Sequence, residues 1–417
     1  MMRRVLLITY TFPPDNVPAA ARPGQLFKYL PECGYQCVVV AANADGSPPE
    51  DDLVHRVPAG DRRSAVEIAS TFARWFTRFC SPYEDRLSWV PYAAAAAADI
   101  IRSQPIEAIY STSPFLAAHF AGLWLKLRYG LPWVADFQDP VRDNPFRDRR
   151  WIYPYDAIIE RAFFRHADWL IANTDTVASA WGNRYPKWAG KISVLWNSYD
   201  PLDGVEPRET PPDPHRVLAH VGSMYGGRHP SQLLMSLERL NIGASTLSVK
   251  FVGPIDRDVL TAHGPLFERL QQKGVLTYGN RSVPRQEALR ETAEADCLLL
   301  LDINEKNASM QMPSKLLDYV RFGKPILAYT PADSPTERIL KRSGIPSISI
   351  DPSATEADGD RKLLEFLRIP TTPRPPSAWF EDTFNARAQA RTVAVLFDKL
   401  LKERQGAKLS PCDERRR

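Results

Sequence analysis

A glycine-rich loop in the second half of the sequence carries the residue types that bind phosphate. The segment HVGSMYGGRHPSQLL contains Gly222, Gly226 and Gly227, which allow a ligand to approach the backbone closely. Arg228 adds a permanent positive charge, and Ser223 lies in the same loop. The pattern is typical of a diphosphate site, although an ordinary turn with a solvated arginine would look similar.

A second segment, MPSKLLDYVRFGKPILAY, has the same character. Pro313 opens a helix, Ser314 and Lys315 fall in its first turn, and Asp318 follows one turn later. Backbone amides and Lys315 are suited to phosphate oxygens, and a carboxylate such as Asp318 can accept two hydrogen bonds from ribose hydroxyls. Each motif alone could also be an ordinary turn or a solvent-exposed helix end. Together, in equivalent loops of one domain, they predict a nucleotide site.

Charged residues cluster after one apolar run of the first half. VADFQDPVRDNP places Asp136, Asp139 and Arg142 directly behind a predicted buried strand. Charges concentrated there usually serve a site, so Asp136 or Asp139 is a candidate general base or a partner for a sugar hydroxyl. The alternative is an Asp–Arg network that fixes the loop.

Two further positions of the first half are candidates for ligand contact. Arg22 follows the proline-rich loop behind the first predicted strand. Ser113 ends another strand in YSTSPF, where it is also a good helix N-cap with Pro114 at the first helical position. Capping and ligand contact explain Ser113 equally well.

Short apolar runs, typical of strands, alternate along the chain with segments of helical periodicity. These predicted strands and helices would position the candidate residues. Such alternation predicts parallel sheets with helices on both faces, that is, an α/β fold of two Rossmann-like domains facing across a cleft. The strands are expected at 5–9, 36–41, 108–110, 133–135, 169–172 and 192–195, then at 217–220, 248–252, 275–278, 297–301, 325–328 and 347–350. Helices of the first half are expected at 25–31, 64–79, 92–102, 115–128 and 152–166.

Proline, aspartate and glycine punctuate residues 197–215, which predicts an interdomain linker. We therefore expect a first domain over 1–200 and a second over 201–379. A helix at about 380–404 is expected to pack back on the first domain, and 405–417 is expected to be a flexible tail. Ligands of such sheets bind beyond the carboxyl ends of the strands, where the motifs above lie.

Composition excludes several classes of protein. The net charge of +4 over 417 residues leaves no electrostatic footprint for nucleic acid. Five scattered cysteines do not form a disulfide framework or a zinc motif, so we expect a cytoplasmic protein without a bound metal. No apolar run is long enough for a transmembrane helix. Aromatic and basic residues at 72–79 fit peripheral membrane contact, although core packing explains them better.

The motifs ITYTFPPDNVPAAAR, IYSTSPF, WVADFQDP, VGSMYGGR and PSKLLDYVRFGKPILAY, in this order, resemble the GT-B glycosyltransferases of family 4. The resemblance spans nearly the whole chain. It implies a nucleotide-diphosphate sugar bound mainly by the second domain and an acceptor bound mainly by the first. It also implies transfer with retention of anomeric configuration and without a cofactor or metal ion.

Residue by residue, the resemblance places the phosphate motif on Gly222 and Arg228 and the ribose carboxylate on Asp318. Two positions depart from the family pattern. Met310 stands where the first of two glutamates is usual, and Gln138 stands where a histidine is usual. Sugar recognition must therefore differ, and no catalytic histidine can be transferred.

The function predicted from the sequence is a glycosyltransferase, in the context of bacterial cell-surface polysaccharide or glycoconjugate synthesis. The acceptor is a saccharide, a lipid-linked saccharide or a small molecule. Two alternatives stay open. One is a nucleotide-sugar epimerase of the same architecture, and the other is a non-catalytic protein that binds the donor, which the Gln138 and Met310 departures would fit.

Overall fold

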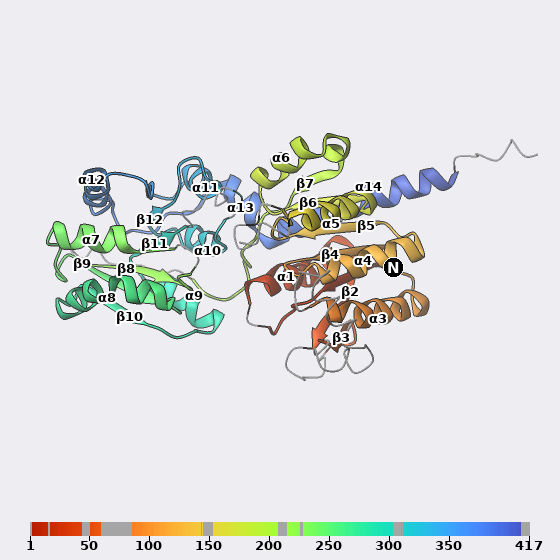
Figure 1. The fold of residues 1–417 in the computed structure, drawn as a ribbon, viewed down its shortest axis with the longest axis horizontal. Helices are drawn as coiled ribbons and strands as arrows, with labels where there is room; N and C mark the ends of the chain where they lie inside the picture. The colour runs from red at the N-terminus through yellow and green to blue at the C-terminus, as the bar shows by residue number, and fades with distance from the viewer. Residues whose placement is uncertain are drawn as a thin grey trace, which may run out of the picture. The chain divides into compact units, whose positions relative to one another are not determined.

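The computed structural model describes residues 2–15, 17–43, 51–59, 86–142, 144, 153–206, 215–225, 228–302, 310 and 312–409. The chain divides into two compact units, one formed by 1–196 with 386–417 and the other by 197–385. Figure 1 shows both, and each is described by itself. The predicted helix at 64–79 and residues 410–417 of the predicted tail lie outside the described residues, whereas residues 405–409 of that predicted tail are helical.

The first domain is built on a parallel sheet with the strand order β3-β2-β1-β4-β5-β6-β7. Its strands are β1 (Arg3–Thr9), β2 (Tyr35–Asn43), β3 (Val54–Pro58), β4 (Ala108–Thr112), β5 (Trp133–Phe137), β6 (Trp169–Ala172) and β7 (Ile192–Val194). Its helices are α1 (Ala21–Tyr29), α3 (Val90–Ser103), α4 (Ala117–Tyr129), α5 (Tyr153–His166), α6 (Asp175–Arg184) and α14 (Ala386–Leu409).

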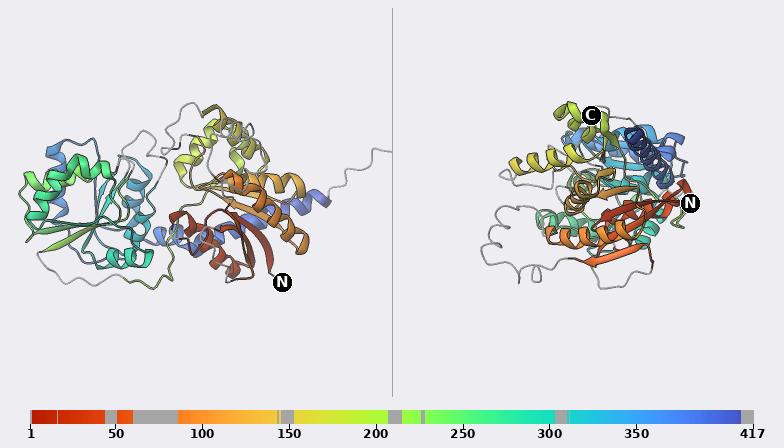
Figure 2. Two further views of the ribbon diagram at one scale, coloured as in Figure 1. Left: turned by 60° about the horizontal axis from the view of Figure 1, so that its bottom comes forward. Right: turned by 90° about the vertical axis from the view of Figure 1, so that its right-hand side faces the viewer.

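Helices cover both faces of this sheet because the strands are apolar on both sides (Figure 2). Alternate residues of β1 are buried against different partners: Val5 and Leu7 share a core with α1 and α14, whereas Leu6 and Ile8 are buried on the other face. Phe397 of α14 is fully buried in the first of these cores, 5.2 Å from the ring of Tyr35. The helix at the end of the chain is therefore part of the first domain's core.

The second domain repeats the plan with the strand order β10-β9-β8-β11-β12-β13, again parallel. Its strands are β8 (Arg216–Val221), β9 (Leu247–Val252), β10 (Leu276–Gly279), β11 (Cys297–Leu301), β12 (Ile326–Tyr329) and β13 (Ser347–Ile350). Its helices are α7 (Ser231–Arg239), α8 (Arg257–Gln272), α9 (Arg285–Glu294), α10 (Lys315–Arg321), α11 (Pro335–Ser343), α12 (Glu356–Phe366) and α13 (Ala378–Phe384).

The predicted α/β fold class with two Rossmann-like domains is thus confirmed, and the predicted strands are found within two or three residues. In each sheet the first three strands are added in one direction and the later strands are added on the opposite side of the first strand. The strand order therefore reverses between β1 and β4 in the first sheet and between β8 and β11 in the second. Ligands of doubly wound sheets bind beyond the carboxyl ends at such switch points.

The predicted linker differs from the structure in its first part. Tyr199 stacks on Phe380 with ring centroids 5.8 Å apart, and its backbone amide donates to the carbonyl of Phe384 at 3.0 Å. Arg321 forms an ion pair with Asp203 at 2.7 Å. These contacts pack the residues after Asn197 into the second domain, while 207–214 lie outside the described residues.

Replacing Phe397 with alanine should lower the free energy of unfolding of the first domain by about 3–5 kcal/mol, because it leaves a cavity against Tyr35 and Tyr110. Every tryptophan except Trp379 lies in this domain, so urea unfolding followed by tryptophan fluorescence reports on it. Val395→Ala on the same helix is the control, because Val395 is 68% exposed. Equal effects of the two variants would contradict this packing.

Candidate functional site

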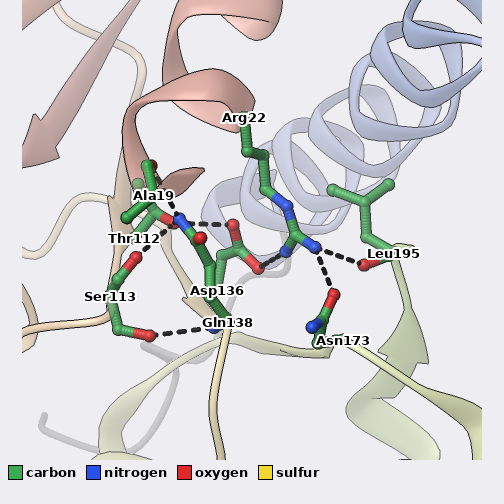
Figure 3. A network of polar contacts seen from close by, with 8 residues as sticks. All are labelled: Ala19, Arg22, Thr112, Ser113, Asp136, Gln138, Asn173 and Leu195. Carbon is green, nitrogen blue, oxygen red and sulfur yellow. Dashed lines mark hydrogen bonds and ion pairs between the residues drawn. The ribbon is translucent and has the colours of Figure 1, made fainter. Parts of the chain in front are cut away.

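A buried ion pair joins α1 to the carboxyl ends of β4, β5, β6 and β7 in the first domain (Figure 3). Arg22 on α1 donates to Oδ1 of Asp136 at 2.6 Å, and the two side chains are 4% and 0% exposed. The same guanidinium donates to Oδ1 of Asn173 at 2.5 Å and to the carbonyl of Leu195 at 3.0 Å. The other carboxylate oxygen of Asp136 accepts from Thr112 at 2.8 Å.

This geometry gives Asp136 and Arg22 a positioning role. Both oxygens of Asp136 are occupied by partners from the protein, and the carboxylate has no exposed surface from which to reach a substrate. The Asp–Arg network that was one of the two sequence interpretations is therefore present, formed with Arg22 rather than Arg142. Asp139 is partly exposed in the loop behind β5 and remains the candidate for contact with substrate.

Ser113 and Gln138 lie beside this network. The backbone amide of Gln138 donates to Oγ of Ser113 at 2.8 Å, and its side-chain amide donates to Thr112 at 3.1 Å and to the carbonyl of Ala19 at 3.2 Å. The capping interpretation of Ser113 is wrong: α4 begins at Ala117, with Leu116 as N-cap. The amide of Ser113 still donates to the carbonyl of Asp136, so the pairing with β5 extends to the residue that was predicted to cap the helix.

An aromatic cluster at the switch point of the first sheet was not found from the sequence. Tyr10 follows β1 and Phe115 follows β4, with ring centroids 5.0 Å apart. The Arg86 guanidinium lies 4.9 Å from the centroid of Tyr10 and 5.3 Å from that of Phe115. No carboxylate among the described residues forms an ion pair with Arg86. An arginine placed on aromatic rings is suited to sugar faces and anionic groups.

The second domain brings Gly222, Arg228 and Lys315 together at its own switch point. Gly222 follows β8 with φ +120, and a Cβ at this position would lie 2.8 Å from Nζ of Lys315. Glycine therefore provides both the backbone conformation and the room for the lysine. On the other side of β8, Gly253 follows β9 with φ +126, and a Cβ there would lie 2.8 Å from the Gly222 carbonyl.

Lys315 faces a histidine from the neighbouring strand. Nδ1 of His220 lies 3.0 Å from the carbonyl of Leu299, which can only accept, so this nitrogen carries the hydrogen. Nε2 then presents a lone pair to Nζ of Lys315 at 3.0 Å. His220 is the last residue but one of β8, and its part in this contact could not be derived from the sequence because Lys315 is 95 residues away.

Burial, together with the nearby Arg228 guanidinium, lowers the pKa of Lys315 to about 7, while the Asp302 carboxylate acts in the opposite direction. Burial and Lys315 also hold the pKa of His220 well below its ordinary value. Asp302 is itself occupied by Thr330 and Thr336, at 3.0 and 2.7 Å. Lys315 therefore loses its proton more readily than an ordinary lysine, and no carboxylate among the described residues forms an ion pair with it.

Arg228 is 7% exposed and lies 4.7 Å from the ring centroid of Tyr225. Within the described part of the chain no carboxylate lies within ion-pair distance of its guanidinium, and Nε has no hydrogen-bond partner. A buried guanidinium without a counter-charge is costly, and an anion bound here would remove that cost. Gly226 and Gly227 lie outside the described residues.

The remaining candidates of this domain lie on or before α10. Ser314 is the N-cap of α10 without a side-chain capping bond and is exposed, and Pro313 is buried before it. Asp318 accepts from Arg285 of α9 at 3.4 Å, and burial raises the pKa of its carboxyl group. Tyr319 fixes α10 to the site, because its hydroxyl accepts from the backbone amide of Val221 at 2.8 Å. Ser223 is partly exposed in the loop behind β8.

Among the residues that the structure describes, no group of three or more His, Cys, Asp or Glu side chains could hold a metal ion. The same residues include no helix with both the length and the apolar character needed to cross a bilayer.

Comparison with known proteins assigns the fold. Residues 19–197 match the model of the glycosyl transferase 4-like domain. The structure resembles sucrose-phosphate synthase from Thermosynechococcus elongatus, with a TM-score of 0.66, 13% identity and coverage of 96% of this chain and 100% of that one. It also resembles a glycosyltransferase from Rickettsia africae, with a TM-score of 0.61, 12% identity and coverage of 96% and 99%.

A third similar structure is HepE from Anabaena in complex with UDP-glucose, with a TM-score of 0.53, 12% identity and coverage of 97% of this chain and 99% of that one. No curated protein matches the sequence significantly. The chain therefore has the GT-B glycosyltransferase fold, and the family match lies within its first domain.

Replacing Arg22 with methionine should lower the free energy of unfolding of the first domain by about 3–5 kcal/mol, because Asp136 is left buried without its counter-charge. Urea unfolding followed by tryptophan fluorescence measures the change. Arg102→Met is the control: it removes the exposed ion pair with Asp99 and should cost less than about 1 kcal/mol. An equal loss of unfolding free energy in the two variants would show that Arg22 is not needed to neutralise buried Asp136.

Proposed function

We propose that this chain, which has the GT-B fold and matches the glycosyl transferase 4-like domain over residues 19–197, is a glycosyltransferase that uses a nucleotide-diphosphate sugar. The observation that carries the proposal is the pair of cations in the second domain. Among the described residues, buried Arg228 has no carboxylate partner, and the hydrogen-bond partner of the Lys315 amine is the neutral His220. A diphosphate supplies the negative charge that this place lacks.

The donor site extends from these cations along α10. Lys315 and Arg228 would bind the diphosphate, with the backbone at Gly222 leaving room for its oxygens. Asp318 follows Lys315 by one helical turn, so its carboxylate is placed to accept hydrogen bonds from ribose hydroxyls in competition with Arg285. The likeness to HepE, which was solved with UDP-glucose, supports a nucleotide sugar as the ligand class.

In a transfer reaction these cations would stabilise the departing nucleotide diphosphate. Charge develops on the leaving oxygen as the bond to the sugar breaks, and preorganised cations in a water-poor site lower the energy of that state. Retention of anomeric configuration, which we propose from the family resemblance, further requires the acceptor oxygen on the face that the leaving group vacates. The chain's own contribution is therefore charge and orientation.

For the acceptor we propose the switch point of the first domain. Asp139, Ser113 and Gln138 provide polar groups there, and the Arg86 guanidinium, held on the rings of buried Tyr10 and of Phe115, provides further donors for a sugar. Gln138 is held by Thr112 and Ala19, so it is an oriented amide and cannot act as a base. We propose a saccharide or lipid-linked acceptor in cell-surface polysaccharide or glycoconjugate synthesis.

The donor site is tested by titration calorimetry of the purified chain with UDP-, GDP- and ADP-sugars. One donor should bind, and Arg228→Ala should weaken it about 10- to 100-fold, because a charge-assisted contact contributes about 1.5–3 kcal/mol. Arg239→Ala is the control: Arg239 ends helix α7, which begins three residues after Arg228, and it pairs with Asp360. Binding of no donor, or equal binding by both variants, would contradict the proposal.

Product analysis then separates the activities. Transfer of the sugar to an added acceptor, with the anomeric configuration read by NMR, supports a retaining transferase. Conversion of the donor to another nucleotide sugar without an acceptor would indicate an epimerase. Saturable binding without any reaction would indicate a donor-binding protein that has lost catalysis.

Donor affinity should fall as pH rises above about 7, because the pKa of Lys315 is about 7 in the free protein and a diphosphate binds the ammonium form. Above that pH binding must take up a proton, and the dissociation constant for UDP should increase up to about tenfold per pH unit. Its terminal phosphate is already ionised in this range. His220 adds no charge, since its pKa is lowered well below the ordinary value.

Calorimetry with UDP at several pH values between about 7 and 9 measures this dependence. In Lys315→Arg the charge is permanent, so the same series should be flat. A slope that persists in Lys315→Arg would assign the titration to another group.

A further inference from the structure

Helices α4 and α5 of the first domain carry large apolar side chains on their outer surface. Trp124 and Leu127 of α4 are 46% and 64% exposed, and Tyr155 and Ile158 of α5 are 37% and 67% exposed. The helices are neighbours, since the rings of Phe120 and Phe163 lie 5.1 Å apart, and they run side by side in Figure 1. Single exposed apolar residues are ordinary, but four on two adjoining helices need an explanation.

The spacing places these residues on defined helix faces. In α5, Tyr155, Ile158, Arg161 and Arg165 follow one another at intervals of three or four residues and therefore lie on one face. Phe163 and Phe164 are buried on the opposite face. Each helix therefore has an inner face committed to the core and an outer face that nothing among the described residues covers.

The charges on these outer faces have one sign. Arg128 of α4 and Arg161 and Arg165 of α5 are exposed, and none forms an ion pair with a described residue. The sequence of α4 contains no acidic residue. The two carboxylates of α5, Asp156 and Glu160, are buried, 1% and 0% exposed. The exposed arginines of α4 and α5 therefore lie among apolar side chains, and neither helix has an exposed carboxylate.

We propose that this α4–α5 surface, defined by Trp124, Leu127, Tyr155, Ile158, Arg161 and Arg165, docks the protein on a bilayer of anionic lipids. Aromatic and aliphatic side chains enter the boundary between headgroups and acyl chains, where tryptophan and tyrosine are favoured. The arginines bind the phosphates of the anionic headgroups. The docking is interfacial, as no helix within the described residues could span a bilayer.

This inference does not depend on the donor site. It concerns α4 and α5 of the first domain, whereas the donor groups belong to the second domain. It also differs from the sequence prediction of membrane contact at 72–79, which lies outside the described residues. Binding of a nucleotide and binding of a vesicle can therefore fail separately.

Vesicle flotation with the full chain tests the proposal. The protein should float with vesicles of phosphatidylcholine and phosphatidylglycerol in equal parts, remain unbound with pure phosphatidylcholine, and lose binding as salt is added. The double variant Trp124→Ser with Leu127→Ser should bind at least tenfold more weakly, and so should Arg161→Glu with Arg165→Glu. These substitutions are on exposed positions, so folding should be kept.

Matched controls carry the same changes elsewhere. Val395→Ser with Leu364→Ser removes two other exposed apolar side chains, 68% and 42% exposed, and Arg257→Glu with Arg290→Glu reverses two exposed arginines of the second domain. Both controls should float like the parent protein. Unchanged urea unfolding and UDP titration in every variant show that the fold is intact.

Three outcomes would overturn the proposal. The first is absence of binding to anionic vesicles by the parent protein, and the second is loss of binding in the controls to the same extent as in the α4–α5 variants. The third is a self-association, seen by light scattering, that the tryptophan variant abolishes while vesicle binding is unchanged. That result would assign the surface to a second copy of the chain.

Discussion

A positive charge inside a protein must be matched by a negative one or lose its proton, and the two domains of this chain meet that requirement differently. In the first, the guanidinium of Arg22 is matched by Asp136, Asn173 and the carbonyl of Leu195. These partners come from β5, from the loop behind β6 and from the end of β7, so one side chain on α1 holds the carboxyl edge of the sheet together. The charge of Arg22 is therefore neutralised by the protein itself.

In the second domain the positive charges at the corresponding edge of the sheet have no carboxylate partner among the described residues. Arg228 cannot lose its proton, and no described carboxylate pairs with it. Lys315 responds instead through its pKa, which burial and Arg228 lower to about 7, and through His220, whose lone pair accepts from the amine. An unliganded site with two full charges would be less stable than one in which the lysine can become neutral. In the donor site that we propose, this arrangement lets Lys315 be neutral without a ligand and carry its charge when a diphosphate binds.

The sequence allowed the architecture to be predicted because apolar runs and loop chemistry are local signals. Strands such as Cys297–Leu301 are fully apolar and are found as predicted, whereas the edge strand Val54–Pro58 and the helix Asp175–Arg184 were missed, since their apolar patterns are weak. Side-chain partners were not predictable in the same way. Arg22 and Asp136 are 114 residues apart, and each looked like a candidate for ligand contact until its partner was known.

Ser113 shows why the same local signal can be misleading. Serine before proline at the end of a strand is the usual pattern of a helix N-cap, yet here the strand pairing continues through the bond from Ser113 to the carbonyl of Asp136. The hydroxyl is then used by the amide of Gln138, which ties the loops behind β4 and β5 to each other. Because the buried network occupies Asp136, Thr112 and Arg22, the acceptor contacts that we propose for this domain must come from groups at the margin of the network. Asp139 and the Arg86 guanidinium on the Tyr10 and Phe115 rings are such groups, so the acceptor that we propose would be held by hydrogen bonds to these side chains.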